Sequence, residues 1–210
     1  MGMKSTDRLG VASTENFGAS RREFLRGLLG AAPALALPFF AERLPAQAIV
    51  QGHGQIKPPE PVPDVALLGS DGASTTFLRM VQGRATAVQL MYTSCSSICP
   101  IEAAIFQRVQ NKLPDMAARG TQLLSLSVDS QTDSPAALAA WLRRFHAGPS
   151  WLAAVSGAQD ALRLQDFFGK GSDSGDHSNQ VSILDRQGRL VWRTYELPTA
   201  EEIIGVLRKL

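Results

Sequence analysis

The sequence predicts an α/β domain in which a mixed β-sheet is covered by helices on both faces. Two observations predict it. Segments of strand type alternate with segments of helical periodicity from about residue 64 to the end of the chain. In addition, residues 85–93 form a continuous apolar run, which is typical of a central strand buried on both faces. In such open sheets, ligand sites lie beyond the carboxyl ends of the strands.

The predicted strands follow in order along the chain. Residues 64–77 alternate around Gly69-Ser70-Asp71-Gly72 and predict a β-hairpin. Further strands are predicted at 85–93, 121–129 and 150–157. A second hairpin begins near residue 179 and turns at Arg186-Gln187-Gly188.

Helices are predicted between these strands. Ser134 is a suitable N-cap for one of them, because a serine hydroxyl can accept from the first free N–H groups, and Pro135 suits the first turn. The predicted helices cover 100–113, 135–145, 158–168 and 201–210, with the last capped near Thr199. The alternation with strands gives the three-layer arrangement.

The amino-terminal region has the pattern of an export signal. Residues 20–25, SRREFL, resemble the twin-arginine motif, and an apolar run follows from about Leu28 to Phe40. That run is shorter than the roughly 20 residues that a membrane span needs. Ala46-Gln47-Ala48 matches an A-x-A cleavage site. We therefore expect residues 1–48 to be a twin-arginine signal peptide and the mature protein to be periplasmic, with membrane association if the leader stays uncut.

Charge and composition limit the kinds of partner that residues 49–210 can bind. Residues 49–210 hold 15 of the 21 basic and 15 of the 19 acidic side chains, so this part has no net charge. A nucleic-acid-binding protein would show a basic stripe, and we expect no nucleic-acid partner. Residues 49–63 are rich in Pro and Gly and predict an extended tether before a domain at 64–210.

Both cysteines of the chain lie in the stretch YTSCSSICP, directly after the predicted central strand. If the following helix starts between Ile98 and Pro100, Cys99 lies in its first turn, where free N–H groups and the helix dipole favour a thiolate. Cys95 lies four residues earlier, so both sulfurs can point to one side. The pair could be a redox dithiol, a disulfide or part of a metal site, since an exported protein meets an oxidising compartment.

A metal site would need further donors or a soft metal. Two thiolates alone suit Cu(I), whereas Cu(II) or Zn²⁺ would want an imidazole as well. His53 lies in the tether, and His146 follows a helix at its carboxyl end, where we expect it to be structural or solvated. His177 lies in the polar loop 169–178 before a strand and is the better candidate. Met91 is expected to be part of the core.

Three ordered stretches resemble the SCO/SenC family: YTSCSSICP, SLSVDSQTDSPAALAAWLRRF and DHSNQVSILDRQGRLVW. They match its C-x-x-x-C-P motif, its acidic segment and its histidine before a strand, and the resemblance extends from about Pro61 to Leu210. It implies a thioredoxin-like fold with an inserted β-hairpin. It also implies one copper ion, as Cu(I) or Cu(II), bound by Cys95, Cys99 and His177.

The resemblance further implies a function. It implies a metallochaperone, a binding protein that helps to assemble the copper centre of cytochrome c oxidase subunit II. Asp129 and Asp133 match the acidic positions of the family, where they would hold loops near the site or contact a partner; a turn residue and a helix cap are the simpler interpretations. Ser96 and Ser130 stand where the family often has proline.

Two other functions use the same cysteines. Some family members are thiol–disulfide reductases, in which the redox pair Cys95 and Cys99 would react with thiol–disulfide partner proteins. A thiol peroxidase is the third alternative, because ICPIE at 98–102 resembles the VCPTE of peroxiredoxins. Ser96 also stands where those enzymes have a threonine. They have a proline four residues before that threonine, however, where this chain has Tyr92.

Overall fold

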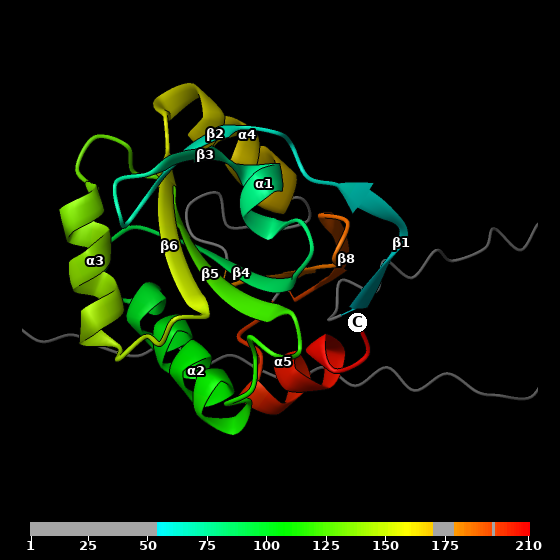
Figure 1. Ribbon diagram of the computed structural model, residues 1–210. Helices are drawn as coiled ribbons and strands as arrows, with labels where there is room; N and C mark the ends of the chain where they lie inside the picture. The colour runs from blue at the N-terminus through cyan, green and yellow to red at the C-terminus, as the bar shows by residue number, and fades with distance from the viewer. Residues whose placement is uncertain (1–53, 170–178, 195) are drawn as a thin grey trace, which may run out of the picture. The chain divides into compact units, whose positions relative to one another are not determined.

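Figure 1 shows a computed structural model of the chain, which describes residues 54–169, 179–194 and 196–210. Every described residue belongs to one compact unit, residues 48–210. Its centre is one eight-stranded mixed sheet with helices on both faces, so the predicted fold class is confirmed. Among the described residues, no helix is long and apolar enough to cross a bilayer.

The strand order in the sheet is β1-β8-β7-β4-β5-β6-β2-β3. The strands are β1 Gly54–Pro61, β2 Ala66–Gly69, β3 Ser74–Thr76, β4 Ala85–Met91, β5 Thr121–Ser127, β6 Trp151–Ser156, β7 Val181–Leu184 and β8 Arg189–Arg193. Only β4, β5 and β6 run parallel to one another, and the other described pairs are antiparallel. We call the end of the sheet where β4, β5 and β6 finish the carboxyl edge, and the opposite end the amino edge.

The helices are α1 Phe77–Val81, α2 Ile98–Lys112, α3 Pro135–Arg144, α4 Ala158–Gly169 and α5 Ala200–Leu207. Two predicted caps are confirmed: the Ser134 hydroxyl accepts from Ala137 N, and Thr199 forms a capping box with Glu202. The short helix α1 was not expected, because five residues are too few to show a helical period.

The predicted tether needs a correction. Residues Gly54–Pro61 are extended, but they form the edge strand β1, which pairs antiparallel with β8 rather than linking freely. Prolines have no N–H to donate to a ladder, so they are tolerated in a strand at the edge of a sheet. The Pro-rich composition is therefore as compatible with an edge strand as with a linker. Residues 49–53 of the predicted tether lie outside the described residues.

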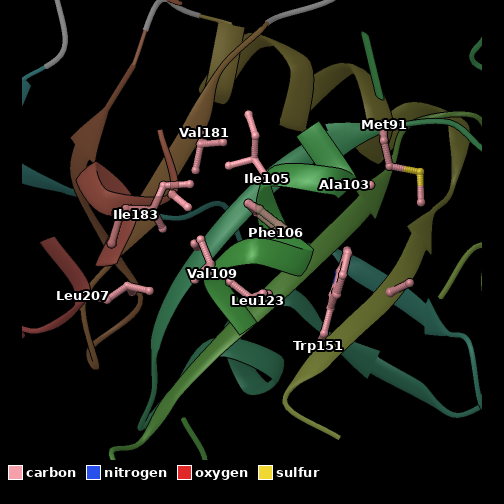
Figure 2. Close-up of a cluster of buried hydrophobic side chains, with 14 of the residues drawn as sticks. Met91, Ala103, Ile105, Phe106, Val109, Leu123, Trp151, Val181, Ile183 and Leu207 are labelled. Atoms are coloured by element: carbon pink, nitrogen blue, oxygen red, sulfur yellow. The ribbon is translucent and has the colours of Figure 1, made fainter. Parts of the chain in front are cut away.

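The hydrophobic core lies on both faces of the sheet. Leu123 of β5 packs in the cluster formed with α2, α3 and α5, whereas the next residue, Leu124, packs in the cluster formed with α1 and α4. Figure 2 shows the first cluster, where Phe106 of α2 and Trp151 of β6 meet edge to face with ring centroids 5.7 Å apart. Met91 belongs to the same cluster, as predicted. Burial on both sides explains the continuous apolar run of the central strands.

Candidate dithiol and metal site

The two cysteines lie at the carboxyl edge, where β4 passes into α2. Cys95 follows a tight turn in which its N–H donates to the carbonyl of Tyr92 (3.1 Å), and Cys99 lies in the first turn of α2, as predicted. Both are free thiols, and their residues are only 4% and 2% exposed. The loop residues between them, Ser96 and Ser97, are exposed. The sulfurs are therefore buried beneath a loop whose serines face the solvent.

The sulfur of Cys95 is the acceptor at the centre of the loop. The Cys99 side chain, the backbone of Cys99 and the backbone of Ser97 all provide hydrogen bonds to it. The Ser97 hydroxyl oxygen lies 3.7 Å from the Cys95 sulfur. The two sulfurs thus lie on one side of the loop within hydrogen-bonding reach, which is the arrangement that both a disulfide and a two-thiolate clamp require.

The two thiols differ in acidity. Burial raises the pKa of Cys95, but the hydrogen bonds from Cys99 and Ser97 outweigh it and bring the pKa down to about 6. Burial, together with the hydrogen bond to Cys95, raises the pKa of Cys99 to about 12. The expectation that the helix would make Cys99 the thiolate was wrong: the free N–H groups at the start of α2 point to the Cys95 sulfur instead.

A buried carboxyl group lies one helical turn beyond Cys99. Glu102 of α2 is fully buried, and neither of its oxygens has a hydrogen-bond partner among the described residues. Burial raises the pKa of Glu102 well above its usual range, and the charge of Cys95 raises it further. The uncharged acid is therefore the favoured form of this group when Cys95 is a thiolate.

Asp133 ties the cysteine loop to the end of β5. Its carboxylate accepts from the N–H of Thr93 (2.9 Å) and from the Thr93 hydroxyl, two residues before Cys95. It also accepts from the Ser127 hydroxyl (2.6 Å). The cap of α3 is Ser134, so Asp133 is free to hold the loop, and the role that the family resemblance suggested is the one seen.

Asp129 has the simpler role. Its carboxylate accepts from the N–H groups of Gln131 and Thr132 and from the Thr132 hydroxyl. The Thr132 hydroxyl is the main cause that lowers the pKa of Asp129. This is a turn at the end of a strand, as the sequence indicated. Together with Tyr92 and α4, the turn lines a groove at the carboxyl edge beside the cysteine loop.

The histidines fall into two groups. His146 follows α3 with a positive φ of 53° and an exposed side chain, which agrees with the predicted solvated role. His53 and His177 lie outside the described residues. Within the parts of the chain that the structure describes, no three His, Cys, Asp or Glu side chains gather as metal ligands. A third ligand for the cysteine pair is therefore not found there.

The fold and the site together define a class. A mixed sheet whose central strand leads through a cysteine pair into a helix is the thioredoxin-like arrangement, with the β2–β3 hairpin added. The SCO1/SenC family model matches residues 62–210, which is most of the chain. The chain belongs to this family.

Solved structures have the same fold. A SCO1/SenC family lipoprotein from Bacillus anthracis is 20% identical, with a TM-score of 0.62 over 74% of this chain and 98% of that one. Yeast Sco1 with copper bound is 21% identical, with a TM-score of 0.60 over 72% and 92%. BsSco, a member of the Sco family of cytochrome c oxidase assembly proteins with a disulfide switch, is 21% identical, with a TM-score of 0.59 over 74% and 96%. No curated protein matches the chain in a sequence comparison.

Glu102 is the residue of this site that the sequence analysis missed. A signal existed, because Glu102 lies three positions after Cys99 and residues three apart on a helix share a face. A charged residue in the sequence is usually assigned to a solvated face, however, and nothing local indicates that this face of α2 is turned into the core.

Proposed function

We propose that this protein is a copper metallochaperone that acts in cytochrome c oxidase assembly. The observation that carries the proposal is the buried pair Cys95 and Cys99, with the sulfurs within hydrogen-bonding reach at the start of α2. The family supports it, and so do two relatives, yeast Sco1 with copper bound and BsSco as a cytochrome c oxidase assembly protein. The proposed recipient is the copper site of cytochrome c oxidase subunit II or a similar protein.

The pair suits copper as cargo. Two thiolates are soft ligands and prefer Cu(I). Binding requires both cysteines to be reduced and deprotonated, so loading releases the proton of Cys99, and the redox state of the pair controls loading. We propose one copper per chain, with Cys95 and Cys99 as ligands in both the Cu(I) and Cu(II) states.

His177 is proposed as the third ligand. The family resemblance supplies this assignment, and the register of the sheet supports it. Val181, four residues further along the chain, pairs with Gln89 near the end of β4, so β7 begins at the carboxyl edge that also carries the cysteines. An imidazole would complete a three-coordinate site and allow Cu(II) to be held as well.

The difference between the two thiols favours thiol–disulfide exchange as the second function. The Cys95 thiolate would attack a partner disulfide, forming a mixed disulfide and releasing one partner thiolate. Cys99, after losing its proton, would then attack the Cys95 sulfur and release the second partner thiolate. The partner gains two electrons, the pair is oxidised to a disulfide, and an external dithiol must reduce it again.

We propose that the protein acts in the periplasm after export by the twin-arginine route. The motif at residues 20–25 supports this proposal. Changing Arg21 and Arg22 together to lysine should leave the protein in the cytoplasmic fraction, whereas a change of Arg26 alone should not. Export of the double variant at the normal level would contradict the proposed route.

An anaerobic titration of the reduced protein with Cu(I) tests the copper site. The variants are Cys99→Ser and His177→Ala, and His146→Ala is the matched control because His146 is exposed at the end of α3. We expect one copper per chain. Affinity should fall strongly in Cys99→Ser and by about 10- to 100-fold in His177→Ala, and it should be unchanged in His146→Ala.

The copper affinities of these variants decide which residues bind copper and whether the protein is a copper chaperone. Loss of affinity with Cys99→Ser alone would leave a two-thiolate site and remove His177 from it. If the reduced protein does not bind Cu(I) tightly at all, the chaperone function is wrong. Rapid reduction of a model disulfide by that same protein would then favour thiol–disulfide exchange.

A further inference from the structure

A second cavity lies at the amino edge of the sheet, away from the cysteines. Its volume is about 240 Å³, and it lies between the end of α5 and the start of β5. Three arginines line it, Arg119, Arg186 and Arg208, together with the hydroxyl-bearing Thr121 and the leucines Leu113 and Leu207. No acidic side chain is among the residues that line it.

The guanidinium of Arg186 is held in place by the backbone. Its Nε donates to a main-chain carboxylate oxygen of Leu210 (3.1 Å), and its Nη2 donates to the carbonyl oxygen of Arg119 (2.9 Å). Gly120 has a positive φ of 61°, and a Cβ at that position would come within 2.6 Å of Nη1. A glycine is therefore needed beneath this guanidinium. A guanidinium has five N–H donors, so three of those on Arg186 remain for a ligand.

The charge of the cavity is positive. Arg119 forms an ion pair with Asp115 (Nε to Oδ2, 2.8 Å). The side chain of Arg208 has no hydrogen bond or ion pair within the described part of the chain. Three guanidinium groups face two carboxylates, the side chain of Asp115 and the main-chain carboxylate of Leu210, which leaves an excess of one positive charge around a space that is open to solvent.

We propose that this cavity binds a phosphate-class oxyanion. Guanidinium groups bind phosphate with two parallel N–H···O bonds, and the locked Arg186 loses little side-chain entropy when it does so. Arg119 and Arg208 would supply the remaining positive charge, and the Thr121 hydroxyl lies in the same wall. The phosphate could belong to a soluble anion or to the headgroup of an anionic lipid. The site shares no residue with the dithiol site, so it stands independently of the copper function.

Calorimetric titration of the metal-free protein with inorganic phosphate tests the site, with chloride at the same ionic strength as the reference. We expect saturable binding in the titration. We also expect phosphate to raise the Tm in thermal unfolding. Arg208→Gln should weaken binding about tenfold, which corresponds to one lost charge-assisted hydrogen bond. Arg163→Gln is the matched control, because Arg163 is an exposed arginine of α4 outside this cavity.

A second arm identifies the source of the phosphate. Co-sedimentation with phosphatidylcholine vesicles is compared with and without phosphatidylglycerol, for the wild type and Arg208→Gln. Binding to the anionic vesicles that is lost in Arg208→Gln would assign the site to a lipid headgroup. Phosphate binding without vesicle binding would assign it to a soluble anion. Heat no greater than that with chloride, or equal weakening by Arg208→Gln and Arg163→Gln, would overturn the proposal.

Discussion

Two buried carboxyl groups flank the cysteine loop, and they are opposite in kind. Asp133 is surrounded by donors, because the Thr93 N–H, the Thr93 hydroxyl and the Ser127 hydroxyl all point to it. Glu102 has no partner for either oxygen among the described residues, and its pKa is raised by burial. Both groups are less than a tenth exposed.

The difference shows that burial alone does not decide what an acidic residue does. Where donors converge, the carboxylate accepts their hydrogen bonds and holds two segments together. Where none is present, the proton stays on the group and its effect depends on pH. The cysteine loop thus has a fixed attachment on its β5 side and a titratable neighbour on its α2 side.

The largest effect is expected when the attachment is removed. Asp133→Ala leaves three donors of Thr93 and Ser127 without their acceptor, and the free energy of unfolding should fall by about 4 kcal/mol. Cu(I) affinity should fall with it, because the loop that carries Cys95 loses its anchor. Urea unfolding and copper titration measure the two effects.

Asp129→Ala is the control for that change. Its carboxylate serves only a local turn, so a loss of about 1 kcal/mol is expected. Equal losses in the two variants would show that Asp133 is no more than a turn residue.

The next effect concerns the pH dependence of stability. The native pKa of Glu102 lies above its unfolded value of 4.5, so above that pH the native state binds more protons than the unfolded state. Stability from this group is complete below pH 4.5 and is lost as pH rises through the native pKa. Glu102→Gln should remove this loss, which amounts to at most about 1.4 kcal/mol for each pH unit.

The measurement is the difference in unfolding free energy between Glu102→Gln and the wild type at several pH values. The difference should grow in favour of the variant as pH rises from 4.5. If the unfolding free energies of the variant and the wild type change with pH in parallel, Glu102 has a hydrogen-bond partner in the protein and is not the uncharged group inferred here.

A smaller effect is expected on the thiols themselves. The Cys95 thiolate should appear with a midpoint near pH 6 in a titration of the ultraviolet thiolate absorbance. Cys99→Ala removes the strongest of the hydrogen bonds that lower this pKa, so the midpoint should rise by about one pH unit. A midpoint that stays near pH 6 in the variant would show that Cys99 does not stabilise the thiolate.

The smallest effect is expected at Ser97. Its hydroxyl is 3.7 Å from the Cys95 sulfur, a long contact for a hydrogen bond even to sulfur. Ser97→Ala should raise the Cys95 midpoint by about a few tenths of a pH unit, less than Cys99→Ala does. Ser96→Ala is the matched control, and an equal shift in the two serine variants would exclude a specific contact from Ser97.

The sequence correctly predicted the secondary structure on either side of the two cysteines. The continuous apolar run located the strand that ends before Cys95, and helical periodicity located the helix whose first turn holds Cys99, since both signals depend on local spacing. The acidic residue that holds the loop, Asp133, could be named only through the family resemblance, because its partner Thr93 lies 40 residues away.

The acidity of the thiols could not be predicted in the same way. It depends on where three N–H or S–H donors point within one turn, and that is a matter of ångströms. The spacing placed Cys99 in the first helical turn but did not show that its own donors would point to Cys95. The edge strand β1 was missed for a related reason, since its pairing with β8 spans most of the domain.

The outer strands of the sheet bear on how a partner can dock. β1 contains Pro58, Pro59 and Pro61, which have no N–H to offer, and β3 at the other end is only three residues long. Both outer strands, β1 and β3, are therefore poor templates for an added strand from another chain. We therefore expect a partner protein to recognise this domain through side chains and shape. For the same reason, the proline-rich β1 and the short β3 protect the protein from edge-to-edge aggregation when it is concentrated.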